Sequence, residues 1–236
     1  MLDLLCTGHV VSCTSPLYGS NDSYLLRLAR TPDNSEIVCG AVYKPRRGEA
    51  PLWDFPDGSL FRREYAAFLT SRALGWMFVP PTAIRTGPHG IGSIQLFVPC
   101  DPTTQYHTFR EAHRQDLMRM ALFDCLVNNA DRKAAHCLKG MDGRIWAIDH
   151  GLTFHTHPKL RTVMYEFLGG PVPDWILTDV AALLQRERSG HALRQALTVL
   201  LEKQEVDLFF KRLEHVLARG VYPEGNAYRQ RAFDWW

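Results

Sequence analysis

The sequence has no long apolar run, no excess charge of one sign and no closely spaced pair of cysteines. A helix needs about 20 apolar residues in succession to cross a bilayer, so no transmembrane segment is expected. The 27 basic and 25 acidic residues give a net charge of +2, and this gives no electrostatic reason to expect nucleic acid as a partner. The first residues carry an acid and no basic stretch, so no secretory signal is expected.

The six cysteines are scattered and form no C-x-x-C motif. We therefore expect reduced, mostly buried thiols and a cytoplasmic protein. The 236 residues suffice for one large domain or for two lobes with a sizeable core. The sequence shows no low-complexity segment and no evident internal repeat.

Hydrophobic patterning divides the chain into two parts. The first part predicts strands over residues 8–12, 23–28, 37–44, 82–85 and 93–98, with a helix over 60–75. The second part predicts a helix that follows a Thr108-x-x-Glu111 capping box, a hairpin of strands 137–139 and 144–148, and helices over 174–187, 191–202 and 205–219.

This pattern predicts an α+β fold with two lobes. We expect a β-rich N-terminal lobe over residues 1–98 and a mostly helical C-terminal lobe over residues 99–236, with Pro99 and Pro102 in the hinge. A cleft between two such lobes is a natural place for a ligand.

Two acidic motifs in the second part are the most informative feature of the chain. Asp131 follows a predicted helix, His136 comes five positions later, and Asp149 stands thirteen positions further on before His150 and Gly151. This layout is typical of a phosphoryl-transfer site, in which the first Asp orients or deprotonates the acceptor hydroxyl and the two later residues bind a divalent metal. The alternative is a structural Asp loop with a hairpin.

Arg132 and Lys133 complete the catalytic candidates. Arg132 could pair with Asp131, stabilise transferring charge or bond the local backbone, and the sequence does not choose among these roles. A zinc site formed by His136, His150, His155 and His157 is a further alternative, although the spacing matches no closed zinc pattern.

Residues of the first part supply the other half of such a site. Lys44 ends a predicted strand and could reach the phosphates of ATP, and Glu64 on the next helix could hold it. Each alone would be a surface charge; their order relative to the two acidic motifs makes them candidates. The other nucleotide-binding candidates are Ser20 and Asn21 in a small-residue loop and Gln95, Phe97 and Val98 in the strand that enters the hinge.

The sequence resembles the phosphatidylinositol 3- and 4-kinases and their atypical-kinase relatives, including the HipA-like bacterial kinases. The family motifs D-R-H-x-x-N and D-F-G align with Asp131-Arg132-Lys133-Ala134-Ala135-His136 and Asp149-His150-Gly151. The resemblance implies a bilobal protein-kinase-like fold that binds ATP and Mg²⁺ or Mn²⁺ and phosphorylates a protein side chain or a small molecule. The acceptor itself is not predicted.

The chain departs from the family at three motif positions. His136 replaces an Asn, which predicts either a preference for Mn²⁺, because Mn²⁺ accepts imidazole more readily than Mg²⁺ does, or weak metal binding. Lys133 replaces a His, and His150 replaces a Phe. Few basic residues follow Gly151, so phosphoinositide binding is not favoured. The alternatives are a pseudokinase that acts as a regulatory scaffold, AMP transfer to a protein, and a metal-binding helical domain without nucleotide.

Overall fold

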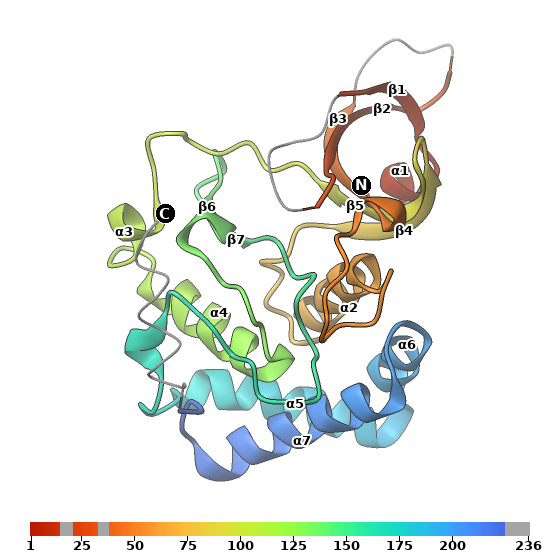
Figure 1. Ribbon diagram of the computed structural model, residues 1–236. Coiled ribbons are helices and arrows are strands. Elements are labelled where there is room, and N and C mark those ends of the chain that lie inside the picture. Colours follow the sequence, from red (N-terminus) through yellow and green to blue (C-terminus); the bar gives the residue numbers. More distant parts are fainter. Residues whose placement is uncertain (15–20, 33–37, 225–236) are drawn as a thin grey trace.

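The computed structural model describes residues 1–14, 21–32 and 38–224, and these form a curved β-sheet and a larger helical part. The sheet has the order β1-β2-β3-β5-β4 and is antiparallel throughout. Its strands are β1 (His9–Cys13), β2 (Tyr24–Ala29), β3 (Cys39–Pro45), β4 (Thr82–Gly87) and β5 (Gly90–Leu96). Figure 1 shows the sheet curving around the short helix α1 (Leu2–Thr7).

The two faces of β3 have different surroundings, because successive side chains of a strand point to opposite faces. Ala41 and Tyr43 are fully buried and pack with Leu4 and Leu5 of α1 in a small core beneath the sheet. Lys44 lies between two buried positions of the strand and is itself only partly buried. The alternation therefore directs Lys44 away from α1 and toward the rest of the molecule.

The helical part begins with α2 and continues after β5. Its helices are α2 (Leu60–Ala73), α3 (Tyr106–Phe109), α4 (Arg114–Val127), α5 (Asp174–Gly190), α6 (Ala192–Leu200) and α7 (Lys203–Arg219). A two-stranded ribbon of β6 (Cys137–Lys139) and β7 (Ile145–Ala147) follows α4, and 3-10 turns cover Arg46–Gly48, Ala134–His136 and Tyr165–Phe167. Gly220 takes the left-handed conformation just beyond α7 with a φ of 63°, as a helix-ending glycine does.

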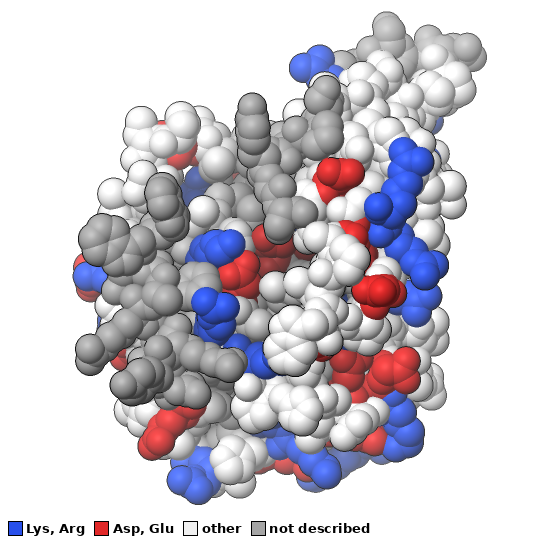
Figure 2. Space-filling model, in the orientation of Figure 1, with Lys and Arg blue, Asp and Glu red and all other residues white. Residues whose placement is uncertain are grey.

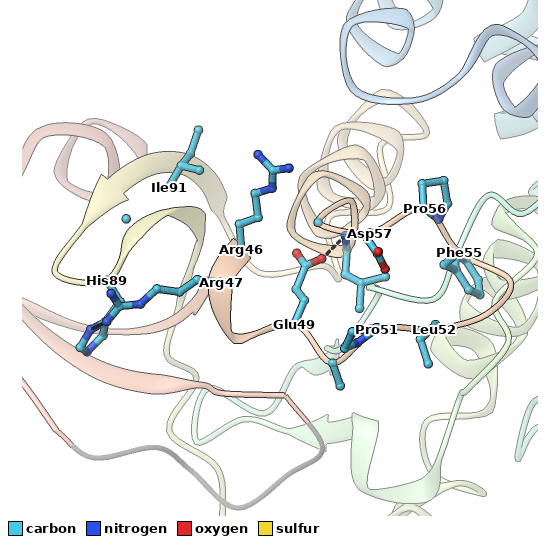
Figure 3. Close-up of a pocket in the computed structure, with 14 residues that line it drawn as sticks. Arg46, Arg47, Glu49, Pro51, Leu52, Phe55, Pro56, Asp57, His89 and Ile91 are labelled. Atoms are coloured by element: carbon cyan, nitrogen blue, oxygen red, sulfur yellow. Dashed lines mark hydrogen bonds between the residues drawn. The ribbon is translucent and has the colours of Figure 1, made fainter.

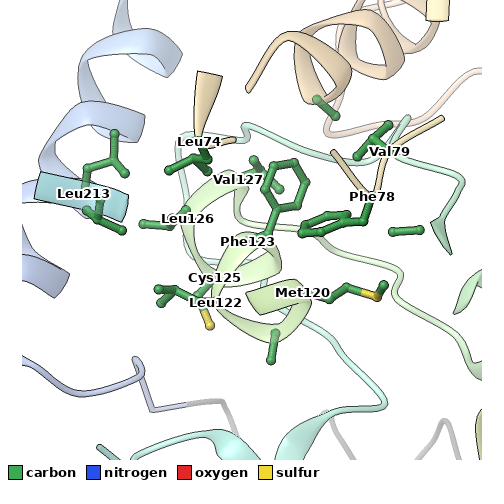
Figure 4. Packing of buried hydrophobic residues seen from close by; sticks show 14 of the residues in the cluster. Leu74, Phe78, Val79, Met120, Leu122, Phe123, Cys125, Leu126, Val127 and Leu213 are labelled. Atoms are coloured by element: carbon green, nitrogen blue, oxygen red, sulfur yellow. The ribbon is translucent and has the colours of Figure 1, made fainter. Parts of the chain in front are cut away.

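The larger hydrophobic core lies among the helices. Phe123 of α4 contacts the ring of Phe78 edge-to-face, with 5.1 Å between the ring centroids, and Figure 4 shows both rings beside Leu74 and Val79. Ala66, Ala67 and Phe68 of α2 belong to this same core, not to the small core under the sheet. Helix α2 therefore packs as a member of the helical part, although it lies between two strands in the sequence.

A buried ion pair also ties α2 to the C-terminal helices. Arg63 Nη2 lies 2.7 Å from Glu205 Oε1 of α7, and both side chains are almost fully buried. Arg63 Nη1 also donates to the carbonyl oxygen of Thr153 at 2.6 Å. Because both charged groups have partners, the desolvation cost of burying each charge is offset. The ion pair joins residues that are 142 positions apart in the sequence.

The predicted α+β class is confirmed, and so is each predicted strand and helix apart from small shifts at the ends. The predicted capping box is wrong. Thr108 is the third residue of the short helix α3, where its hydroxyl accepts from the Gln105 N–H at 3.0 Å, and α4 begins only at Arg114. The lobe boundary at residue 98 stays a prediction. Within the described ranges, no helix combines the length and apolar character needed to span a bilayer.

Candidate active site

Lys44, Glu64 and Asp149 meet in a cleft between the sheet and the helical part. The Lys44 ammonium contacts Glu64 Oε1 closely and donates to Asp149 Oδ1 at 2.8 Å. Glu64 is buried on α2, whereas the Asp149 side chain is 45% exposed. The strand end, the helix and the turn after β7 thus bring three charged groups together from distant parts of the sequence.

The charges in this cluster stabilise one another. Burial alone would lower the pKa of Lys44, but the carboxylates of Asp149 and Glu64 outweigh it and raise the pKa above its ordinary value. The Lys44 ammonium in turn holds the pKa of Asp149 well below its ordinary value, although burial opposes this. Lys44 is therefore charged and Asp149 ionised at neutral pH.

Asp149 has an unusual backbone conformation. Its φ is 61°, in the left-handed region that residues other than glycine seldom adopt. The neighbouring peptide groups are held on both sides: the Ile148 carbonyl oxygen accepts from Arg132 Nη1 at 2.7 Å, and the His150 N–H donates to Glu64 Oε2 at 2.9 Å. These contacts hold a conformation that the residue alone would disfavour, as is common at functional sites.

Asp131, Lys133 and His136 face the same cleft from the loop after α4. Lys133 Nζ lies 3.1 Å from Asp131 Oδ2, and His136 Nε2 lies 3.2 Å from Asp149 Oδ2. His136 Nδ1 is 3.0 Å from the Asp131 carbonyl oxygen, which fixes the ring. Burial lowers the pKa of His136, and the charge of Arg132 adds to this effect against the opposing charge of Asp149, so the imidazole is neutral at pH 7 and able to ligate a metal.

Arg132 is not among the residues that line the cleft, and its predicted catalytic role stays a prediction. Its side chain is fully buried, with Nε 2.9 Å from Asp124 Oδ2 and Nη2 3.0 Å from Asp124 Oδ1. Nη1 donates to the carbonyl oxygens of His136 at 3.1 Å and Ile148 at 2.7 Å. Of the roles considered for Arg132, bonding of the local backbone is the one that these contacts match, with Asp124 as the buried partner.

Asp124 and Asn129 are site residues that the sequence analysis missed. Asn129 Nδ2 donates to Asp124 Oδ1 at 2.8 Å, and Asn129 Oδ1 accepts from the Asp131 N–H at 3.0 Å. The loop that carries Asp131 is thus bonded to the buried Arg132–Asp124 pair. A signal was present, because Asp124 falls on the apolar stripe of a predicted helix with Met120 and Val127, and a carboxylate there needs a buried partner.

His150 joins the catalytic loop to α2. Its Nε2 lies 2.7 Å from Arg132 Nη2 and must accept this hydrogen bond, because a guanidinium has no acceptor. Burial holds the pKa of His150 well below its ordinary value, and the charge of Arg132 adds to this effect. Among the residues that the structure describes, its buried Nδ1 has no hydrogen-bond partner. His150 thus links Glu64, through its backbone N–H, to Arg132, through its ring Nε2.

The cleft has a volume of about 300 Å³. Besides the charged groups already described, it is lined by Asn21, Asp22, Ser23, Pro45, Glu49, Leu60, Phe61, Gly151 and Leu152. Glu49, another residue missed by sequence analysis, accepts from the N–H groups of Leu60 at 3.0 Å and Phe61 at 2.8 Å and so caps α2. Acidic and basic side chains are interspersed over the face drawn in Figure 2, as the near-neutral net charge predicts.

Not every predicted nucleotide-binding residue reaches this cleft. Gln95, Phe97 and Val98 are absent from its lining. Gln95 is buried and donates to Thr82 Oγ1 at 2.9 Å, and the Phe97 N–H donates to the Gly40 carbonyl oxygen at 3.0 Å and is unavailable to a base. Asn21 lines the cleft and accepts from the Ala50 N–H at 2.6 Å. Ser20 lies outside the described residues.

The donor set suits a divalent cation held partly by protein and partly by other ligands. Asp149 Oδ2 and His136 Nε2 converge, and cations bound with phosphates commonly take only one or two protein side chains. Among residues 1–14, 21–32 and 38–224, no group of three or more His, Cys, Asp or Glu side chains is placed to hold a metal. The zinc alternative therefore finds no support in this part of the chain, where His155 Nε2 instead lies 2.8 Å from the Asp54 carbonyl oxygen.

Comparison with solved structures defines the class of fold. The structure of hydra Fam20 with sugar superimposes with a TM-score of 0.56 at 15% identity, covering 92% of this chain and 86% of that one. The Golgi casein kinase with Mn/ADP bound gives 0.51 at 16% identity, with 96% and 79% covered. The kinase CtkA of Helicobacter pylori gives 0.53 at 12% identity, with 92% and 94% covered. The chain therefore has a kinase-like α+β fold.

Sequence comparison places the chain in a family. It is 40% identical over 244 residues to protein Rv2133c of Mycobacterium tuberculosis (strain ATCC 25618 / H37Rv). The alignment covers 85% of this chain and 87% of Rv2133c. The chain belongs to the same family as Rv2133c. A scan against models of known protein families finds no match.

Proposed function

We propose that this protein is a phosphotransferase that uses ATP and a divalent cation, with a hydroxyl group of a protein side chain or of a small molecule as acceptor. The observation that carries the proposal is the convergence of Lys44, Glu64, Asp131 and Asp149 on one cleft. Surface charges would not be expected to gather in this way from positions as far apart as 44 and 149. The kinase-like fold supports the same conclusion.

Each side chain has a role that fits its position. Lys44 would bind phosphate oxygens, and Glu64 holds its ammonium in place. Asp131 would orient the acceptor hydroxyl and accept its proton, with Lys133 beside it as a cation. Asp149 and His136 would hold the metal, whose charge offsets that of the phosphates. The Golgi casein kinase structure with Mn/ADP bound supports this use of nucleotide and metal.

A phosphoinositide acceptor is not favoured. Anionic head groups require several cations close together, and Lys159 and Arg161 are the only basic residues between Gly151 and Glu166. Lys159 already contacts the carboxylate of Asp54 and lies over the ring of Trp53. The resemblance to the phosphatidylinositol kinases thus concerns the catalytic motifs and does not extend to the substrate.

Calorimetric titration of ATP in the presence of MnCl₂ tests the proposal. We expect metal-dependent binding to the wild-type protein and its loss in Asp149→Asn, with Asp116→Asn as the matched control because Asp116 is exposed on α4. Release or transfer of label from the γ-phosphate of ATP should then depend on Asp131. No nucleotide binding by the wild-type protein would refute the proposal.

A second candidate is nucleotide binding without transfer, in a pseudokinase that regulates a partner. The presence of His136 where the related kinases carry Asn favours it. Binding that depends on Asp149 without any release of label would identify this function. Transfer of label from the α-phosphate, and not from the γ-phosphate, would instead identify AMP transfer.

A further inference from the structure

A second cavity, of about 540 Å³, lies beside the cleft and is larger than it. The connection between β3 and α2 forms most of its wall, and the turn between β4 and β5 closes one side (Figure 3). Glu49 and Leu60 line both spaces. Its volume falls within the range of about 300–1,000 Å³ that is typical of small-molecule sites. None of the roles assigned above uses this cavity.

One end of the cavity is cationic. Arg46, Arg47 and His89 line it, and Arg47 Nη2 contacts His89 Nδ1. Arg46 lies against Gly58, where a Cβ atom would come within 2.3 Å of its Nε, so the absence of a side chain at this position makes room for the guanidinium. No carboxylate of residues 1–14, 21–32 or 38–224 forms an ion pair with Arg46 or Arg47. Neither guanidinium is thus neutralised by a direct ion pair with a described carboxylate. Burial raises the pKa of Glu49, although the charge of Arg46 acts on this carboxyl and tends to lower its pKa.

The other part of the cavity is apolar. Pro51, Leu52, Phe55 and Pro56 line it, and Ile91, which is 45% exposed, adds an apolar side chain on the side of Arg46 and His89 (Figure 3). Phe55 is buried, because its ring packs edge-to-face on His155 and under the guanidinium of Arg63. This wall is therefore fixed by contacts that link it to the helical part.

Two carboxylates also line the cavity. Both oxygens of Glu49 already accept the N–H groups of Leu60 and Phe61, so this group is engaged. Figure 3 shows Asp57 near Pro56, away from Arg47 and His89. An anionic group would therefore bind at the Arg47 end, with its apolar portion against Leu52 and Phe55.

We propose that this cavity is a second ligand-binding site, which takes a small molecule with one anionic group, a phosphate ester or a carboxylate, and an apolar body. The Arg47 guanidinium beside His89 binds the anion, since such a fork suits phosphate and carboxylate oxygens. Arg46, whose side chain points in another direction in Figure 3, adds its positive charge to this end of the cavity. The apolar wall binds the body of the ligand. This site is separate from the cleft and does not depend on the phosphotransferase proposal.

The test uses 1-naphthyl phosphate as the probe and 1-naphthol as its neutral counterpart, each titrated into the full chain by calorimetry. We expect saturable binding of the phosphate and binding of 1-naphthol that is weaker by about tenfold. The double variant Arg46→Ser, Arg47→Ser should bind the phosphate about tenfold more weakly. Ile91→Glu places a carboxylate in the cavity from β5 and should also weaken the binding of 1-naphthyl phosphate.

Matched controls distinguish binding in this cavity from binding in the cleft and from a general effect of lost positive charge. Arg188→Ser, Arg219→Ser removes the same charge at two exposed positions on α5 and α7 and should leave the affinity unchanged. Lys44→Met should also retain the affinity, because Lys44 lines only the cleft. Equal affinity of the wild type and the Arg46, Arg47 variant would overturn the proposal. So would loss of binding in Lys44→Met, or equal affinity for 1-naphthol.

Discussion

Arg132 and Asp124 form a two-pronged ion pair that is fully buried beneath the candidate catalytic loop, with N–O distances of 2.9 and 3.0 Å. The guanidinium also bonds the carbonyl oxygens before and after the β6–β7 ribbon, those of His136 and Ile148. One buried side chain thus fixes the loop of Asp131 and the turn of Asp149 relative to each other. This arrangement supplies a rigid layer of contacts beneath the candidate site, as a functional site of defined geometry requires.

We predict that Arg132→Met strongly destabilises the protein. Removing one partner leaves the Asp124 carboxylate buried without a counter-charge, which typically costs about 3–5 kcal/mol in the free energy of unfolding. Arg194→Met is the matched control, because Arg194 pairs with Asp207 at 2.8 Å on the surface and such exposed pairs contribute about 1 kcal/mol or less. Urea denaturation measures both values. Similar losses in the two variants would contradict the prediction.

We predict that His136→Asn shifts the metal preference toward Mg²⁺. An amide oxygen suits the hard Mg²⁺ ion better than the imidazole Nε2 that faces Asp149 at 3.2 Å. The measurement is the ratio of ATP affinities in Mg²⁺ and in Mn²⁺, which should rise several-fold in the variant. His157→Asn, at an exposed position, is the control. An unchanged ratio would show that His136 does not contact the metal.

We predict that stability falls as the pH drops from 7.5 to 5.5 in the presence of a chelator. Burial holds the pKa of His150 well below 6.5, so the ring stays neutral in the folded state, whereas the unfolded state takes up a proton below about pH 6.5. The unfolded state then binds more protons, and the free energy of unfolding decreases by about 1 kcal/mol for this histidine. His150→Phe should reduce this dependence, and His9→Gln, which changes an exposed histidine, should not.

We predict that thiol reagents distinguish the cysteines. Burial raises the pKa of the Cys137 thiol to about 12 and also raises that of Cys125, so both should resist alkylation in the folded protein. Cys6 and Cys100 are exposed and should react first with iodoacetamide. Peptide mapping by mass spectrometry after partial alkylation gives the order. Early labelling of Cys125 would show that the helical core opens.

The elements of this fold could be predicted because their signals are local. A run of β-forming residues over 37–44, ended by Pro45, predicted β3, and the apolar stripe from Val206 to Leu217 predicted α7. The capping box failed because Thr108 and Glu111 fit the pattern but lie in a separate, shorter turn. Such a pattern does not show which of two neighbouring helices, α3 or α4, the threonine will cap.

The candidate site was predictable where spacing along the chain carries the chemistry. Asp131, His136 and Asp149 are spaced like the motifs of the phosphatidylinositol 3- and 4-kinases that the sequence resembles, and the structure brings them to one cleft. The sequence could not show whether Arg132 faces the cleft or the core. A cation at this position fits either a phosphate-binding site or a buried partner for Asp124. Glu49 gave no signal at all, because its role as a cap depends on a loop that returns to the first turn of α2.

The packing of α2 has a consequence for how the cleft can open. Its apolar side chains belong to the helical core, and Arg63 anchors it to α7, whereas Lys44 stands on a sheet that has its own core with α1. The ion pair between Lys44 and Glu64 therefore joins elements whose buried side chains belong to two different hydrophobic cores, although α2 also contacts β4 and β5. A movement of the sheet relative to the helical part would change the distances from Lys44 to both Glu64 and Asp149, so these two contacts report on the opening of the cleft.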